Sequence, residues 1–142
     1  MNPREELENG IKLLNPIMEA SGFHFVFESG GNSSGGIFSQ GAFVSGRKRL
    51  ELSFRYSLGC VEYRIDNNEI SHAEYMEALG KKGEAKYPGF SNKPIMAFEH
   101  LASDISKFSE TFLKGSEEEF ITLIDSYKRK PKKSGFAALS SK

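Results

Sequence analysis

Apolar side chains recur at every second position in three stretches of this chain, and this period constrains the fold more than any other feature. Residues 23–28 carry phenylalanine at each odd position, residues 49–56 carry apolar side chains at even positions, and residues 60–65 carry them at odd positions. Successive side chains of a β-strand point to opposite faces, so this period is typical of strands with one buried face. Residues 37–44 form a further extended run, in which Gly41 interrupts the alternation and predicts a bulge. The sequence therefore predicts four strands.

The register of the last two predicted strands follows from their apolar and charged positions. A tight turn at residues 58–59 would pair Phe54 with Tyr63 on the apolar face. The same register places Arg55 opposite Glu62 on the other face, so that opposite charges meet. We therefore expect a hairpin whose solvent face is stabilised by complementary charges.

Helical signals flank the strands. Residues 2–21 begin with an Asn cap and a Pro at the first helical position, and Pro16 predicts a kink or a restart of that helix. A Ser-x-x-Glu capping box opens a short helix at residues 71–79, a long helix is expected over residues 94–115, and a second capping box opens a final helix at residues 116–127. The prediction is an α+β fold: an N-terminal helix, a four-stranded antiparallel β-meander that a turn at Asn67-Asn68 ends, and C-terminal helices packed on one face of the sheet.

Charge divides the chain into an acidic body and a basic tail. Six of the 19 basic residues lie in residues 128–142, which hold no acidic residue, so residues 1–127 carry 13 basic and 19 acidic side chains and a net charge of −6. We expect one globular domain over residues 1–127 and a disordered tail over residues 128–142. An acidic body disfavours nucleic-acid binding, because cations that neutralise phosphate supply most of the nonspecific affinity. Nucleic-acid binding through the tail stays open as an alternative.

The cellular location is inferred from one cysteine and from the absence of long apolar runs. Cys60 has no second cysteine to pair with, which suits a reducing compartment. No stretch approaches the roughly 20 apolar residues of a membrane helix, and residues 1–6 lack the apolar run of a signal peptide. We expect a cytoplasmic protein with no membrane partner.

No motif indicates a catalytic, metal or cofactor site. Residues 30–36 have the G-x-x-x-x-G spacing of a phosphate-binding loop but lack the following Lys and lead into a strand, so we expect a flexible hairpin loop. His100 and Asp104 are four residues apart and are expected to form an exposed helix pair, because two ligands are too few for zinc. We expect His24 on the solvent face and His72 in a capping or packing position.

The solvent face of the sheet is the main candidate for a binding surface. Arginine makes planar contacts with carboxylates and is enriched at interface hot spots, although arginines interleaved with glutamates also suit a solvated face of cross-strand ion pairs. Two aromatic residues flank a turn at Pro88-Gly89, and we favour their folding back onto the edge of the core over their projecting as anchors. The candidate binding residues are Arg47, Arg49, Arg55, Arg64, Asn32, Tyr87 and Phe90.

These observations favour a noncatalytic protein that binds another protein, of the inhibitor, immunity or adaptor type. We expect no cofactor. A homodimer through the sheet face is a further possibility, because Arg55 and Glu62 could exchange partners across a twofold axis. The enzyme alternative is a small hydrolase or transferase whose site gathers His24, His72, residues 30–36 and Arg55; convergence of these residues in one pocket would favour it.

Overall fold

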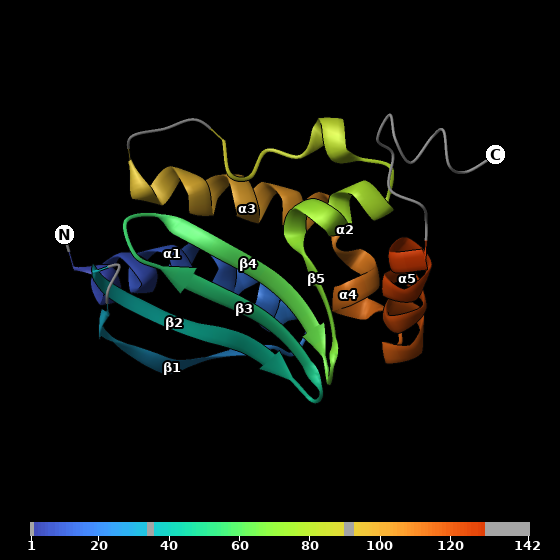
Figure 1. Ribbon diagram of the computed structural model, residues 1–142, viewed down its shortest axis with the longest axis horizontal. Helices are drawn as coiled ribbons and strands as arrows, with labels where there is room; N and C mark the ends of the chain where they lie inside the picture. Colours follow the sequence, from blue (N-terminus) through green and yellow to red (C-terminus); the bar gives the residue numbers. More distant parts are fainter. Residues whose placement is uncertain (1, 34–35, 90–92, 130–142) are drawn as a thin grey trace.

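The computed structural model describes residues 2–33, 36–89 and 93–129. In these residues an N-terminal helix precedes a five-stranded antiparallel sheet and a set of C-terminal helices (Figure 1), which confirms the predicted α+β class. The elements are α1 (Pro3–Ala20), β1 (His24–Ser33), β2 (Gly36–Ser45), β3 (Lys48–Phe54), β4 (Leu58–Ile65), β5 (Asn68–Ser71), α2 (His72–Ala78), η1 (Lys82–Glu84), α3 (Pro94–Phe108), α4 (Glu110–Lys114) and α5 (Glu117–Arg129).

The strands lie side by side in chain order, as a meander from β1 to β5. Helices α1 and α3 pack against each other on one face of the sheet, and α2, α4 and α5 gather at its β5 end (Figure 1). The core between these layers is built from the alternating side chains of the strands and the apolar stripes of the helices, including Leu50, Leu52, Tyr63, Phe98 and Leu101. Within the described residues no helix is long and apolar enough to cross a membrane.

Helix α1 begins as the sequence predicts, because the Asn2 Oδ1 accepts hydrogen bonds from the backbone N–H groups of Arg4 and Glu5 at 3.0 and 3.4 Å. It then runs as one element through Pro16, so the predicted restart does not occur. Proline removes a single hydrogen bond from the helix, and the buried stripe of α1, which includes Leu14 and Met18, stabilises the helix on both sides of that position.

The prediction of four strands was one short. After β4 a two-residue turn at Asp66-Asn67, in which Asp66 has a φ of 54°, returns the chain into β5. Asn68 belongs to this strand, and Ile70 places its buried side chain in the core. A four-residue strand offers too few positions for an alternating pattern to be recognised in the sequence.

The glycine-rich segment was expected to be a flexible loop, but most of it is strand. β1 continues to Ser33 and pairs with β2 as far as Gly36, while residues 34 and 35 lie outside the described part of the chain. A bulge was predicted at Gly41, which lies in β2. The observed bulge lies instead in the neighbouring strand β1, between Phe27 and Ser29. Gly41 stands opposite it, and a Cβ there would lie 2.3 Å from the Val26 carbonyl oxygen, so this position has no room for a side chain.

The predicted register of β3 and β4 was wrong. Tyr63 pairs with Leu50 rather than with Phe54, because Leu58 is buried and begins β4 instead of forming the turn. The chain reverses through residues 55–57, and the apolar face is unchanged because the shift preserves the side of each residue. The charged face does change, since arginine now lies opposite arginine and glutamate opposite glutamate.

The predicted long helix is divided at Ser109, whose buried side chain points to the sheet. Both capping boxes are confirmed, with reciprocal hydrogen bonds between Ser71 and Glu74 and between Ser116 and Glu119.

Cysteine cross-linking tests the observed register. Ser53 and Cys60 are Cα partners, and directly opposite residues of antiparallel strands lie about 4.5–5.5 Å apart, within the range of a disulfide. We expect Ser53→Cys to form an intramolecular disulfide with Cys60 under mild oxidation, detected by non-reducing peptide mapping. Ser57→Cys is the control, because position 57 faces Cys60 only in the register with a turn at residues 58–59. A bridge from position 57 but none from position 53 would contradict the structure.

Candidate functional site

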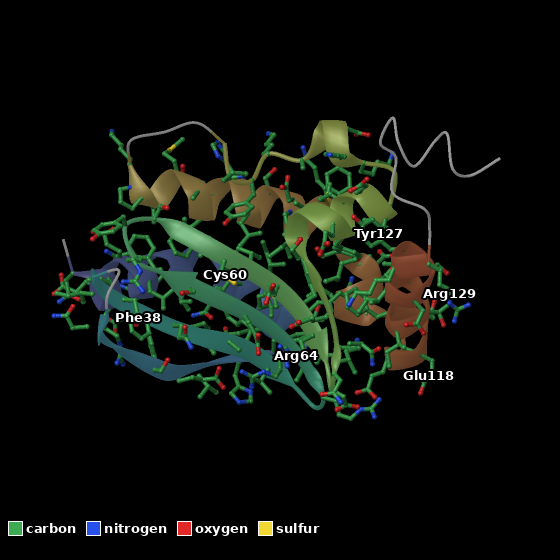
Figure 2. All side chains as sticks on the ribbon, in the orientation of Figure 1. Phe38, Cys60, Arg64, Glu118, Tyr127 and Arg129 are labelled. Carbon is green, nitrogen blue, oxygen red and sulfur yellow. The ribbon has the colours of Figure 1, made fainter. Side chains whose placement is uncertain are left out.

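The face of the sheet that points away from α1 and α3 is the outer face. It carries the side chains that alternate with the core residues, and Cys60 and Arg64 are labelled on it in Figure 2. No helix of the described residues packs on this face (Figure 1). Its main residues are Val26, Glu28, Arg49, Glu51, Cys60, Glu62, Arg64 and Glu69.

Two of the predicted binding arginines lie on the outer face and are already paired there. Arg49 donates to Glu28 and, at 3.0 Å, to Glu51. Arg64 donates to Glu69, and its Nε lies 3.7 Å from a carboxylate oxygen of Glu51. Glu51 therefore bridges two arginines, and an ionic ladder crosses the sheet from β1 to β5.

The other two arginines lie in the turns at the two ends of β3. Arg47, in the turn between β2 and β3, forms ion pairs with Asp66 at 3.0 Å and with Glu117 at 2.7 Å. Arg55 donates to the Gly36 carbonyl oxygen at 2.6 Å and stacks over a phenylalanine ring of β2. The four predicted arginines are therefore distributed along the sheet rather than gathered in one pocket.

The remaining predicted binding residues, Asn32, Tyr87 and Phe90, do not form a common site among the described residues. Asn32 is exposed in β1, and Phe90 lies outside the described residues. Tyr87 folds back onto the core edge, as favoured from the sequence, and its hydroxyl donates to the Leu58 carbonyl oxygen at 2.6 Å. Burial raises the pKa of Tyr87 to about 12, so its hydroxyl stays protonated as a donor at neutral pH.

Carboxylates outnumber arginines on the outer face. Glu51 and Glu62 are directly opposite each other, and like charges at such positions destabilise a sheet. Burial raises the pKa of Glu62, and the nearby charges of Glu69 and Glu51 raise it further. Burial also raises the pKa of Cys60, and the negative charge of Glu62 raises it further. This thiol is therefore not an activated nucleophile.

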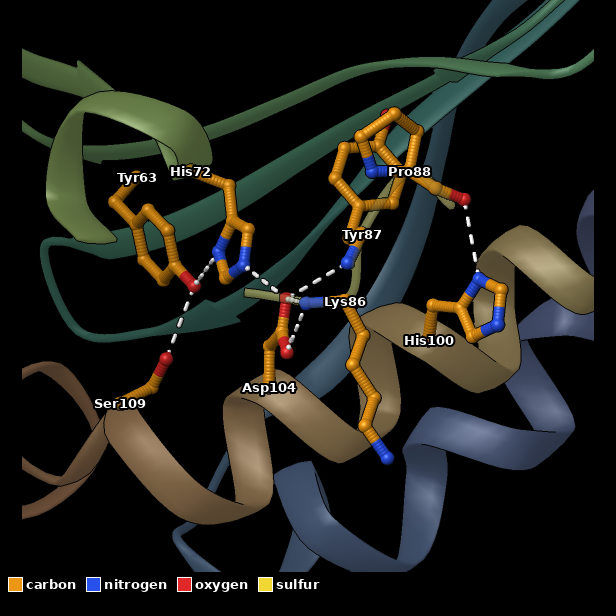
Figure 3. A network of polar contacts seen from close by, with 8 residues as sticks. All are labelled: Tyr63, His72, Lys86, Tyr87, Pro88, His100, Asp104 and Ser109. Atoms are coloured by element: carbon orange, nitrogen blue, oxygen red, sulfur yellow. Dashed lines mark hydrogen bonds and ion pairs between the residues drawn. The ribbon is translucent and has the colours of Figure 1, made fainter. Parts of the chain in front are cut away.

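A buried polar network lies on the other side of the sheet (Figure 3). The Tyr63 hydroxyl lies 2.7 Å from His72 Nδ1 and 3.0 Å from Ser109 Oγ, and His72 Nε2 lies 3.0 Å from Asp104 Oδ2. All four side chains are at most 1% exposed. Both Asp104 oxygens already accept from backbone N–H groups, so Nε2–H of His72 donates to this carboxylate and Nδ1 accepts from the tyrosine.

Asp104 also holds the segment that follows η1. Its two oxygens accept hydrogen bonds from the backbone N–H of Lys86 at 2.8 and 3.0 Å, and Oδ2 accepts from the N–H of Tyr87 at 2.9 Å. His100, which the sequence paired with Asp104, instead faces the Pro88 carbonyl oxygen at 3.2 Å (Figure 3). The predicted exposed pair was therefore wrong.

Sequence reasoning missed this network because it placed Asp104 on the polar side of its helix. The signal that could have found it is spacing, since Asp104 follows the buried Leu101 by three residues and precedes the buried Ile105. A carboxylate in a buried helix stripe requires partners, but nothing in the sequence identified His72, 32 residues away, as one of them.

The enzyme alternative required four features to converge, and the structure separates most of them. His24 is exposed at the start of β1, while residues 30–33 and Gly36, the described part of the glycine segment, lie at the far end of the β1–β2 hairpin. His72 is buried in the network, whereas Arg55 bonds to the Gly36 carbonyl oxygen of the glycine segment. Among the described residues no group of three or more His, Cys, Asp or Glu side chains could hold a metal ion.

No protein-family model, curated protein or solved structure matches this chain. The buried network is enclosed and its groups are bonded to one another, so it can position the chain but offers no open place for a substrate. The outer face combines exposure with an unbalanced charge, and it is the better candidate for a functional site.

Replacing the carboxylate of the network tests its structural role. We expect Asp104→Asn to lower the free energy of unfolding by about 2–4 kcal/mol, because an amide exchanges one accepting oxygen for a donor and leaves buried N–H groups without partners. Urea denaturation measures the change. Asp125→Asn, in α5, is the control and should change stability by less than about 0.5 kcal/mol. Equal stability of the two variants would show that the network contributes little.

The buried histidine predicts a pH dependence. Burial lowers the pKa of His72 more than Asp104 raises it. Below the unfolded pKa of about 6.5 the unfolded chain binds a proton that the folded chain resists, so stability is full above this pH and falls as pH drops toward the folded pKa. We expect a loss of up to about 1.4 kcal/mol per pH unit, measured by urea denaturation between about pH 7.5 and pH 5.5.

His72→Gln provides the comparison for this pH dependence. It is expected to be less stable throughout but to show a flatter pH profile over the same range. An unchanged slope in this variant would assign the pH dependence to other groups.

Proposed function

We propose that this chain is a noncatalytic protein-binding module that docks a basic protein surface on the outer face of its sheet. The inhibitor, immunity and adaptor types all fit such a module, and the lone Cys60 supports a cytoplasmic location. The proposal rests on one observation: the helices pack on the other face of the sheet and leave an exposed face with an excess of carboxylates.

The charges of the outer face support a basic rather than an acidic partner. Four glutamates and two arginines contribute the charged groups of this face, and both arginines are engaged by glutamates of the same face. An acidic ligand would have to displace these internal pairs. A basic surface would instead meet carboxylates that remain uncompensated, and the net charge of −6 over residues 1–127 would attract it over longer distances.

The position of Glu62 supports the same partner. It faces Glu51 and makes no ion pair among the described residues, and the attraction of nearby Arg64 lowers the pKa of Glu62 less than burial, Glu69 and Glu51 raise it. Such an arrangement costs the free protein stability, and a lysine or arginine of a bound protein would relieve it. Functional surfaces commonly retain groups that are unfavourable in the free protein for this reason.

A charge reversal at Glu62 tests the proposal. The wild-type chain, tagged and immobilised at moderate salt, is used to isolate a stoichiometric basic protein from a lysate of the native host, and the affinity is then measured by calorimetry. We expect Glu62→Lys to weaken binding by at least about tenfold, because it removes a carboxylate contact and adds repulsion. The folded variant should be at least as stable as the wild type, since the substitution removes the repulsion from Glu51.

Glu118→Lys is the matched control, because it makes the same change in net charge on an exposed position of α5 (Figure 2). It should retain nearly full affinity. Equal loss in both variants would indicate a general charge effect, and equal affinity in both would place the binding surface elsewhere.

A further inference from the structure

The two edge strands of the sheet differ: β5 is short and covered, whereas β1 is long and open. β5 has four residues, leads directly into α2, and has α5 packed beside it (Figure 1). β1 has ten residues, and within the described part of the chain its one neighbouring strand is β2. In the described residues no backbone hydrogen bond joins the outer edge of β1 to another segment. A long edge of unpaired N–H and C=O groups is a template for adding another strand.

The first half of β1 lacks the features that usually prevent strand addition. Lysine, proline and a bulge commonly protect an edge, but residues 24–27 contain no lysine or proline, and the bulge follows only after Phe27. Val26 is 39% exposed on the outer face, and the rings of Phe25 and Phe27 remain half-buried on the inner face. This segment therefore has a regular backbone. Arg4 stacks over the Phe27 ring at 3.6 Å, and the exposed parts of Val26 and Phe25 are apolar surface that another strand could cover.

The sequence around Val26 is complementary to itself. In an antiparallel pair with a twofold axis at this residue, Val26 lies opposite Val26 of the second copy, and Phe25 lies opposite Phe27. Glu28, which the bulge leaves without a partner in β2, then lies next to His24 of the second copy, and the symmetry repeats this contact at the other end. Aromatic pairs are favourable at facing positions of a sheet, the two valines add an apolar contact, and an imidazole N–H can donate to a carboxylate.

The surroundings of these residues leave room for the second copy. Arg49 bonds to Oε1 of Glu28, so Oε2 can accept from the histidine. A hollow of about 420 Å³ opens between α1 and the β1 edge; Phe27 lines it on the strand side, and Ile11 is the one apolar residue among the α1 residues that line it. Side chains on the inner face of the added strand would lie beside this hollow.

We propose that the chain forms a symmetric homodimer by antiparallel pairing of β1 with β1 of a second copy, centred on Val26. The two sheets then join into one continuous sheet, and their outer faces lie on the same side. The dimer uses backbone groups and the His24, Val26 and Glu28 side chains. It is thus distinct from a dimer through the sheet face, and it does not depend on the proposed basic partner.

Sedimentation of the purified full-length chain tests the dimer. We expect a monomer–dimer equilibrium with dimers predominating by about 200 μM, since weak specific interfaces have micromolar dissociation constants. Val26→Lys should raise the dissociation constant by at least about tenfold, because two lysines would meet at the axis. Val26→Thr keeps a β-branched side chain without charge and should remain dimeric. Thermal unfolding of both variants confirms that the monomers are folded.

A cross-link at the axis tests the register. In a Cys60→Ser background, Val26→Cys should form an intermolecular disulfide on mild oxidation, because the two residues face each other across the axis. Ile37→Cys is the control, since this exposed residue of β2 lies away from the paired edge, and it should stay unlinked.

Three results would overturn the proposal: a wild-type chain that is monomeric at about 200 μM, a Val26→Lys variant that dimerises like the wild type, or cross-linking that is no faster at position 26 than at position 37. A monomeric chain whose isolated protein partner is lost in Val26→Lys would assign the edge to a strand of that partner. These readouts are independent of Glu62, so failure of the dimer and failure of the proposed function are distinguishable.

Discussion

The buried carboxylate of Asp104 is the constraint on which the packing of the C-terminal half depends. It accepts from His72 of α2 and from the backbone of Lys86 and Tyr87, and the histidine extends the connection to Tyr63 of β4 and Ser109. A buried charge is tolerated only when it is fully bonded, so the network admits one arrangement of these segments. The segment after η1, the short helix α2 and the break between α3 and α4 are therefore positioned together.

Placing the helices on one side of the sheet leaves the outer face uncovered, and the register of its strands decides which charges meet there. With Glu51 opposite Glu62, the arginines bridge between carboxylates instead of each facing one. The face that looked rich in arginine in the sequence carries more glutamates than arginines in the folded protein, because β1 and β5 add Glu28 and Glu69 and because Arg47 and Arg55 lie in turns at the ends of the hairpins. The same alternation gives β1 an exposed valine on this face, and the edge of the sheet and its outer face become neighbouring candidate surfaces.

Local chemistry predicted much of the fold. The Asn2 cap, both capping boxes and the period-two strands describe interactions within a few residues, and these are present. The prediction was wrong where a distant contact decided the outcome. Burial of Leu58 moved the turn between β3 and β4, and the bond from Ser109 to Tyr63 accompanies the division of the predicted long helix. Asp104 was assigned to an exposed pair with His100, because its actual partners are 17, 18 and 32 residues away in the chain.

The sequence by itself determined the class of the fold and the two faces of the sheet, because side-chain periodicity and helix caps act locally and do not require knowledge of neighbours. It also determined the acidity of residues 1–127. Only the tertiary structure decided which charges meet on the outer face, which histidine is buried, and which strand forms the open edge. Each of these depends on register or on packing between segments far apart in the chain, and several registers satisfy the same alternating pattern.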